Sequence, residues 1–125
     1  MQILVVDANF LMSAYRFKVD AINGLNELLP AGYQLLAPSS VMQELEGLSR
    51  NKSPSGKGAT YALEILKREG VKVIKTEKSA DDWIVDYCSS NGAIACTNDS
   101  ALRKRLRENK VKSIVLKGRA RIDYA

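Results

Sequence analysis

The segment Gln2-Ile3-Leu4-Val5-Val6-Asp7-Ala8-Asn9 decides the fold of this sequence. Its four consecutive apolar residues, Ile3 to Val6, predict a short strand that is buried on both faces. The residues that follow favour a turn, so the strand leads directly into a helix. A buried strand that is followed by a helix is the repeating unit of α/β domains.

Similar apolar runs recur along the chain, and segments with helical spacing of apolar residues separate them. Further strands are expected at residues 33–37, 71–75, 93–97 and 113–117. Helices are expected at residues 41–48, 59–69, 80–91 and 99–109, with one broken or two short helices within 10–29. Strands that alternate with helices imply right-handed crossovers. The prediction is one domain over residues 1–125, a three-layer α/β/α fold with a five-stranded, mostly parallel sheet.

Residues 47–58 interrupt this pattern. They are rich in helix-breaking residues and contain three basic residues, Arg50, Lys52 and Lys57, and no acid. This composition predicts an exposed, flexible loop.

The composition restricts the possible chemistry. Histidine is absent, which removes the commonest general base and the commonest transition-metal ligand. Cys88 and Cys96 lie within separate apolar patterns, which favours buried, reduced thiols over a zinc site or a disulfide. No run approaches the roughly 20 apolar residues of a membrane span, and Met1 leads directly into a strand. We therefore expect a cytoplasmic protein that does not contact a membrane.

The charge distribution favours a polyanionic partner. The net charge is +5, and nine basic residues and one acid lie between Arg103 and Arg121. Asp81, Asp82 and Asp86 form an acidic cluster just before this basic segment. An acidic cluster beside a basic surface is not typical of an ordinary solvated surface.

Acidic residues follow four of the expected strands. Asp7 follows the first strand, Glu44 lies in the helix after the second, Asp81 and Asp82 follow the third, and Asp99 follows the fourth. Ligands of parallel sheets bind beyond the carboxyl ends of the strands, so we expect these acids at one edge.

Each acid also has a structural explanation, because Asp stabilises helix starts. Asp82 fits this explanation best, since it follows Ser79 at the spacing of a capping box. Asp81 instead shares a helix face with the apolar residues that follow it. Glu44 lies at the edge of an apolar helix face, where a carboxylate needs a compensating partner.

Carboxylates that converge repel one another unless some are protonated or a cation lies between them. Oxygen ligands without histidine favour Mg²⁺ or Mn²⁺. One or two such ions could activate water and stabilise the leaving oxygen of a phosphodiester. The sequence therefore predicts metal-dependent phosphodiester hydrolysis at Asp7, Glu44, Asp81 and Asp99.

Four short motifs, in order along the chain, resemble those of the PIN-domain nuclease family. They are Asp7-Ala8-Asn9, Val41-Met42-Gln43-Glu44-Leu45, Ala80-Asp81-Asp82-Trp83-Ile84 and Thr97-Asn98-Asp99. The resemblance covers nearly the whole chain. It implies metal ligation by the same four acids and support of the site by the side chains of Asn9 and Thr97. Because the third motif has two adjacent acids, Asp82 is an additional candidate ligand.

Within the family, the doubled acid and the basic stretch at residues 47–58 look more like the ribosomal-RNA-processing branch than the toxin branch. This resemblance implies an endoribonuclease that acts on a ribosomal precursor. The alternative is a toxin-type, VapC-like ribonuclease with an antitoxin partner. The family also implies a homodimer. A non-catalytic RNA-binding or ribosome-assembly module is the alternative from a different class.

Two groups of basic residues are candidates for contact with RNA phosphates. They are Arg103, Lys104 and Arg107 on the expected helix after Asp99, and Arg50, Lys52 and Lys57 in the expected loop. The alternative for each residue is an ordinary solvated surface.

Two other enzyme classes fit less well. Asp7, Thr97 and Lys117 at strand ends suit a response regulator, but the third strand lacks the aspartate that would accept phosphate. A phosphatase of the haloacid dehalogenase type would need a second aspartate where Asn9 stands.

Overall fold

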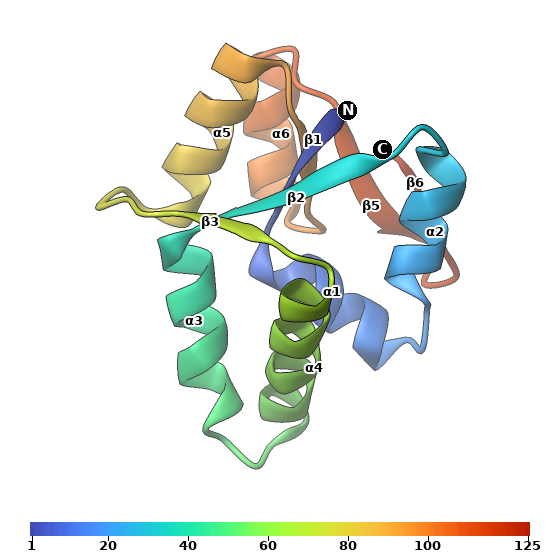
Figure 1. Cartoon of the computed structure of the whole chain (residues 1–125), viewed down its shortest axis with the longest axis vertical. Coiled ribbons are helices and arrows are strands. Elements are labelled where there is room, and N and C mark those ends of the chain that lie inside the picture. The colour runs from blue at the N-terminus through green and yellow to red at the C-terminus, as the bar shows by residue number, and fades with distance from the viewer.

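The computed structural model describes all residues, 1–125, and contains every strand that the sequence predicts (Figure 1). The strands are β1 (Gln2–Val6), β2 (Tyr33–Pro38), β3 (Lys72–Ile74), β4 (Ile94–Cys96), β5 (Ser113–Lys117) and β6 (Arg121–Tyr124). The helices are α1 (Ala8–Arg16), α2 (Ala21–Leu28), α3 (Ser39–Ser49), α4 (Pro54–Arg68), α5 (Ala80–Asn91) and α6 (Ser100–Glu108). None of these helices is long and apolar enough to cross a membrane.

The strands form one sheet in the order β3-β2-β1-β4-β5-β6. β1 pairs in parallel with β2 on one side and with β4 on the other. Successive strands therefore run outward from β1 in one direction and from β4 in the other. The crevice beyond the carboxyl ends of β1 and β4 is the topological switch point, where α/β sheets of this kind bind their ligands.

Helices cover both faces of the sheet, as the three-layer prediction requires. Leu4 and Val6 of β1 belong to a core of 20 buried residues to which α1, α2, α3 and α4 contribute. Val5, between them, belongs to a second core of 11 buried residues under α5 and α6. This alternation follows from the two-residue period of a strand. Figure 1 shows α5 and α6 next to each other and apart from the group of α1, α3 and α4.

The sheet has six strands, one more than the sequence predicts. β6 is antiparallel to β5 and pairs Arg121 with Lys117. The tight connection between them uses left-handed backbone conformations at Gly118, with φ 62°, and at Arg119, with φ 57°. Apolar runs could not reveal β6, because only one of its four residues, Ile122, is buried.

The prediction of a flexible loop at residues 47–58 is wrong for most of that stretch. α3 continues to Ser49 and α4 begins at Pro54, so only residues 50–53 connect them. Ser53 caps α4 by accepting a hydrogen bond from the Gly56 N–H at 3.3 Å, and a proline in the first turn suits a helix start. Gly56 is buried against the backbone of Asn51, so here glycine permits close packing inside a helix.

Candidate active site

Asp7 lies at the switch point, directly after β1. Its backbone N–H donates to the carbonyl of Cys96 at 3.0 Å, which extends the pairing of β1 with β4. Its buried carboxylate accepts hydrogen bonds from the Ala8 N–H at 2.9 Å and from the Thr97 hydroxyl at 2.8 Å. Burial raises the pKa of the Asp7 carboxyl, and these two bonds offset part of that effect. Asp7 is therefore a buried acid with a fixed orientation.

The segment Thr97-Asn98-Asp99 is held beside Asp7 by a network of short bonds. The Thr97 hydroxyl, besides its bond to Asp7, accepts from the Asp99 N–H at 3.1 Å. The Asn9 side-chain oxygen accepts from the Asn98 N–H at 2.9 Å and lies 3.4 Å from the Thr97 hydroxyl. The Asn98 side chain in turn accepts from the Leu116 N–H at 2.9 Å. The segment is thus fixed against the start of α1 and against β5.

Asp99 is the N-cap of α6. Its Oδ1 atom accepts from the Leu102 N–H at 2.9 Å, while Oδ2 has no hydrogen-bond partner in the structure. One carboxylate oxygen therefore has the structural task that Asp often has at a helix start, and the other is available to a ligand.

The four acids at the strand exits influence one another electrostatically. The pKa of Asp7 is raised by burial and also by repulsion from Asp81 and Asp99. Partial burial raises the pKa of Glu44, and repulsion from Asp7 and Asp81 adds to it. The pKa of Asp81 is raised by burial and then by Asp99, and Arg105 counteracts part of the shift. The fold therefore brings Asp7, Glu44, Asp81 and Asp99 to one edge of the sheet.

This arrangement suits a hard cation, although it is not a closed cage. No three acidic or cysteine side chains converge closely enough to form a ready-made metal site. None of the four acids takes part in any of the four ion pairs of the structure, and Arg105 offsets only part of the rise in the pKa of Asp81. An all-oxygen donor set of this kind matches Mg²⁺ or Mn²⁺ better than zinc or copper.

Asp82 differs from the other acids. It is exposed, and its carboxylate accepts from Arg105 Nη2 of α6 at 2.9 Å. This bond is the largest of the effects that lower the pKa of Asp82. The Asp82 N–H donates to the Ser79 hydroxyl at 3.3 Å, which forms one half of the predicted capping box. Asp82 thus connects α5 to α6.

The predicted RNA-binding residues fall into separate places. Arg50, Lys52 and Lys57 are exposed near the short connection between α3 and α4. Lys104 is exposed on α6, whereas Arg103 and Arg107 line a cavity with a volume of about 400 Å³.

A larger cavity, of about 790 Å³, includes Asn9, which lies two residues after Asp7 at the edge of the sheet that carries the four acids. It lies between α1 and the start of α4 and is lined by Asn9, Met12, Ser13, Tyr15, Arg16, Lys18, Pro54, Ser55 and Gly58. Arg16 and Lys18 were not candidates from the sequence. Arg16 follows Asn9 by seven residues within one helix, which places both on one face, and this spacing was the available signal.

Comparison with known proteins agrees with this architecture. The chain matches the family described as "PIN like domain" over residues 4–119. It is similar to Ribonuclease VapC9 of Archaeoglobus fulgidus, with 32% identity over 120 residues that cover 94% of this chain and 85% of the relative. It is also similar to Ribonuclease VapC4 of Methanocaldococcus jannaschii, with 28% identity over 117 residues, or 91% and 89% of the two chains.

Two solved structures share the fold. The PIN domain endonuclease Utp24 matches with a TM-score of 0.81 and 25% identity, over 98% of this chain and 90% of that chain. The structure of VapBC2 from Rickettsia felis, bound to a DNA fragment from its promoter, matches with a TM-score of 0.57. The match covers 82% of this chain and 92% of that chain. At 17% identity this second match shows the fold alone. The family match over residues 4–119 and the ribonuclease relatives show that this chain belongs to the PIN-domain nuclease family.

Proposed function

We propose that this chain is a divalent-metal-dependent ribonuclease whose reaction takes place at Asp7, Glu44, Asp81 and Asp99. One observation carries the proposal: the four acids come from separate strand exits, repel one another at one edge of the sheet, and form no ion pair with a basic side chain. The names of the curated relatives support RNA as the substrate.

The donor set supports Mg²⁺ or Mn²⁺ as the cofactor, and PIN nucleases generally use divalent metals. Asp7, Glu44, Asp81 and Asp99 would hold the ion, and Asp82 remains bound to Arg105. When bound, such an ion activates water and stabilises the leaving oxygen of the phosphodiester.

Thr97 has a positioning role in this proposal. Its hydroxyl donates to Asp7 and accepts from the backbone of Asp99, so one side chain fixes two of the acids relative to each other. Asn9 supports the same segment through Asn98. Side chains that orient metal ligands in this way affect metal affinity and activity by about 10- to 100-fold.

The cavity beside Asn9 offers room for the RNA strand. Its volume of about 790 Å³ is within the range of about 300–1,000 Å³ that is usual for ligand pockets. Arg16 and Lys18 at its far end supply positive charge for phosphates of a strand whose cleaved bond lies at the acids.

The test incubates the purified chain with single-stranded and structured RNA and Mg²⁺ or Mn²⁺. We expect internal cleavage products, which define an endonuclease, and a loss of about a hundredfold or more in Asp7→Asn. Asp82→Asn is the matched control, because Asp82 belongs to the same motif as Asp81, and it should keep the activity. Binding of RNA without metal-stimulated cleavage would instead support the non-catalytic module.

For the biological role we propose cleavage of a ribosomal precursor, since the doubled acid Asp81-Asp82 resembles the ribosomal-RNA-processing branch. Similarity to the VapC ribonucleases favours a second candidate, a toxin-type ribonuclease with an antitoxin partner. Expression of the chain alone and, separately, its deletion from the cell distinguish them. A toxin arrests growth unless Asp7 is changed to Asn, whereas loss of a processing enzyme accumulates uncut ribosomal precursor.

We also propose the homodimer that the family resemblance implies. Light scattering coupled to size exclusion tests it: the dimer predicts twice the chain mass of 13.8 kDa, and a single-chain mass would contradict it.

A further inference from the structure

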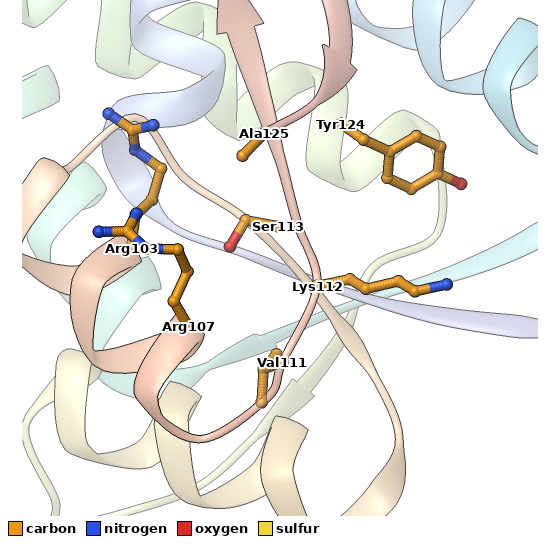
Figure 2. Close-up of a pocket in the computed structure, with 7 residues that line it drawn as sticks. All are labelled: Arg103, Arg107, Val111, Lys112, Ser113, Tyr124 and Ala125. Atoms are coloured by element: carbon orange, nitrogen blue, oxygen red, sulfur yellow. The ribbon is translucent and has the colours of Figure 1, made fainter.

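The cavity that Arg103 and Arg107 line lies away from the acidic edge. It is lined by two residues of α6, by the segment that leads into β5, and by the end of β6 with the residue after it (Figure 2): Arg103, Arg107, Val111, Lys112, Ser113, Tyr124 and Ala125. β5 is parallel to β4, so Ser113 at its amino end lies at the edge of the sheet opposite to Asp99. This cavity is therefore distinct from the proposed active site and from the larger cavity at Asn9.

Its donors have no partners within the protein. Arg103 and Arg107 are four residues apart on α6 and so lie one above the other on the same face. Neither takes part in an ion pair, and the Nε atom of Arg103 is buried without a hydrogen-bond partner. In Figure 2 the hydroxyl of Ser113 points toward the side of the pocket where the two arginines lie. The guanidinium groups of Arg103 and Arg107 thus keep their donors for a ligand in the pocket, because no side chain or carbonyl of the protein accepts from them.

We propose that this pocket binds a phosphate group of RNA. The identity of the polyanion rests on the proposed ribonuclease function. Arginine carries only donors, arranged in a planar fork that fits phosphate oxygens in a bidentate manner. Two such forks and a hydroxyl form a donor-rich site for an anion with several acceptor oxygens. The volume of about 400 Å³ leaves room for a phosphate and the sugar next to it.

The pocket lies along α6 from the acids, so a phosphate bound there would belong to a nucleotide that flanks the cleaved bond. Arg107 follows Asp99 by eight residues along α6, which corresponds to about 12 Å at the rise of an α-helix. An RNA strand whose cleaved bond lies at the acids can follow α6 and place a flanking phosphate between the two arginines. The pocket then holds RNA outside the reacting bond and contributes to affinity without sequence preference.

The test measures the affinity of a fluorescently labelled single-stranded RNA by anisotropy at several salt concentrations. All proteins carry Glu44→Gln, so that the RNA stays intact while Mg²⁺ is present. Arg107→Ala is compared with Lys67→Ala, which removes the same charge from an exposed position of α4 outside the pocket. Arg103→Lys, which keeps the charge and loses the fork, and the double variant Arg103→Ala/Arg107→Ala complete the set.

We expect Arg107→Ala to weaken binding severalfold and to lower the slope of log affinity against log salt by about one, and the double variant by about two. Arg103→Lys should bind RNA with intermediate affinity. Lys67→Ala should match the parent. Because Arg107 is exposed, the single variant is informative even if the double variant does not fold.

Two results would overturn the assignment. Equal losses in Lys67→Ala and Arg107→Ala would show a general charge effect, and an unchanged affinity in Arg107→Ala would show that the pocket does not contact RNA. If polyglutamate, used as an acidic peptide, bound in an Arg107-dependent manner while RNA did not, the pocket would belong to a protein partner. Cleavage is assayed separately in chains that keep Glu44, so the failure of this inference and that of the proposed function are distinguishable.

Discussion

Thr97 connects two of the four acids, and its hydroxyl group is completely buried. Thr97→Val keeps the shape of the side chain but leaves the Asp7 carboxylate and the Asp99 N–H without this partner. We expect a loss of about 1–3 kcal/mol in stability and of about 10- to 100-fold in cleavage.

The pH dependence separates positioning from mere stability. The bond from Thr97 lowers the pKa of Asp7, so its removal raises that pKa. If Asp7 must be ionised, the acidic limb of the pH–rate profile moves to higher pH in Thr97→Val and returns in Thr97→Ser. A lower rate with an unmoved acidic limb would leave Thr97 only a structural role.

Glu44 allows a test of the repulsion among the acids. Its folded-state pKa is raised, so the folded state binds more protons than the unfolded state between the two pKa values. Stability that is present below the unfolded pKa, about 4.3, is thus lost as pH rises through the folded pKa. Without metal, Glu44→Gln should melt above the wild type at pH 7, and the difference should vanish at low pH. Lower melting of Glu44→Gln at pH 7 would contradict the repulsion.

At the scale of the elements, Gly56 decides how α3 and α4 connect. A Cβ atom at this position would lie 1.9 Å from the Asn51 carbonyl oxygen, a backbone atom that cannot move aside easily. We expect Gly56→Ala to destabilise the fold by several kcal/mol, about 3 or more, in urea denaturation.

Gly47 provides the matched control. It lies within α3, and a Cβ there meets nothing within 4 Å. Gly47→Ala should therefore stabilise the chain by up to about 1 kcal/mol through helix propensity. Similar effects of the two substitutions would show that the close approach at Gly56 is not important.

These two glycines also show what the sequence could predict about the elements. Apolar runs locate strands and helices that bury their own side chains, which is why β1 to β5 were predictable. The sequence predicts a loop at Gly56, because the close contact of this residue with Asn51 depends on the path of the chain between two helices. β6 could not be predicted either, because its one buried residue makes its contact only in the folded chain. Its Ile122 packs where a Cβ of Gly24 in α2 would be, 2.6 Å away, and this contact exists only in the assembled fold.

The candidate site was more predictable than its surroundings. Strand exits at one edge of a parallel sheet must lie close together, so the order of Asp7, Glu44, Asp81 and Asp99 in the sequence was sufficient to place them. The ion pair between Asp82 and Arg105 could not be predicted, because it depends on how α5 packs against α6 in the folded chain. The cavity between α1 and α4 could not be predicted either, because its lining residues are far apart in the sequence.

For the whole molecule, the layout of charge suits a polyanion that crosses the surface. The acids gather at one edge, while unpaired basic residues line a cavity beside them and a second one at the end of α6. The net charge of +5 supplies a long-range attraction that brings the polyanion to this surface and that added salt weakens.

The central claim is that the acids at the switch point hydrolyse RNA with a divalent metal. It is tested most directly by the rate of RNA cleavage as a function of Mg²⁺ concentration, in the wild type and in Asp7→Asn. We expect a rate that is absent in EDTA, that saturates with Mg²⁺ in the wild type, and that falls by about a hundredfold or more in Asp7→Asn. A rate that persists in EDTA, or that Asp7→Asn leaves unchanged, would contradict it.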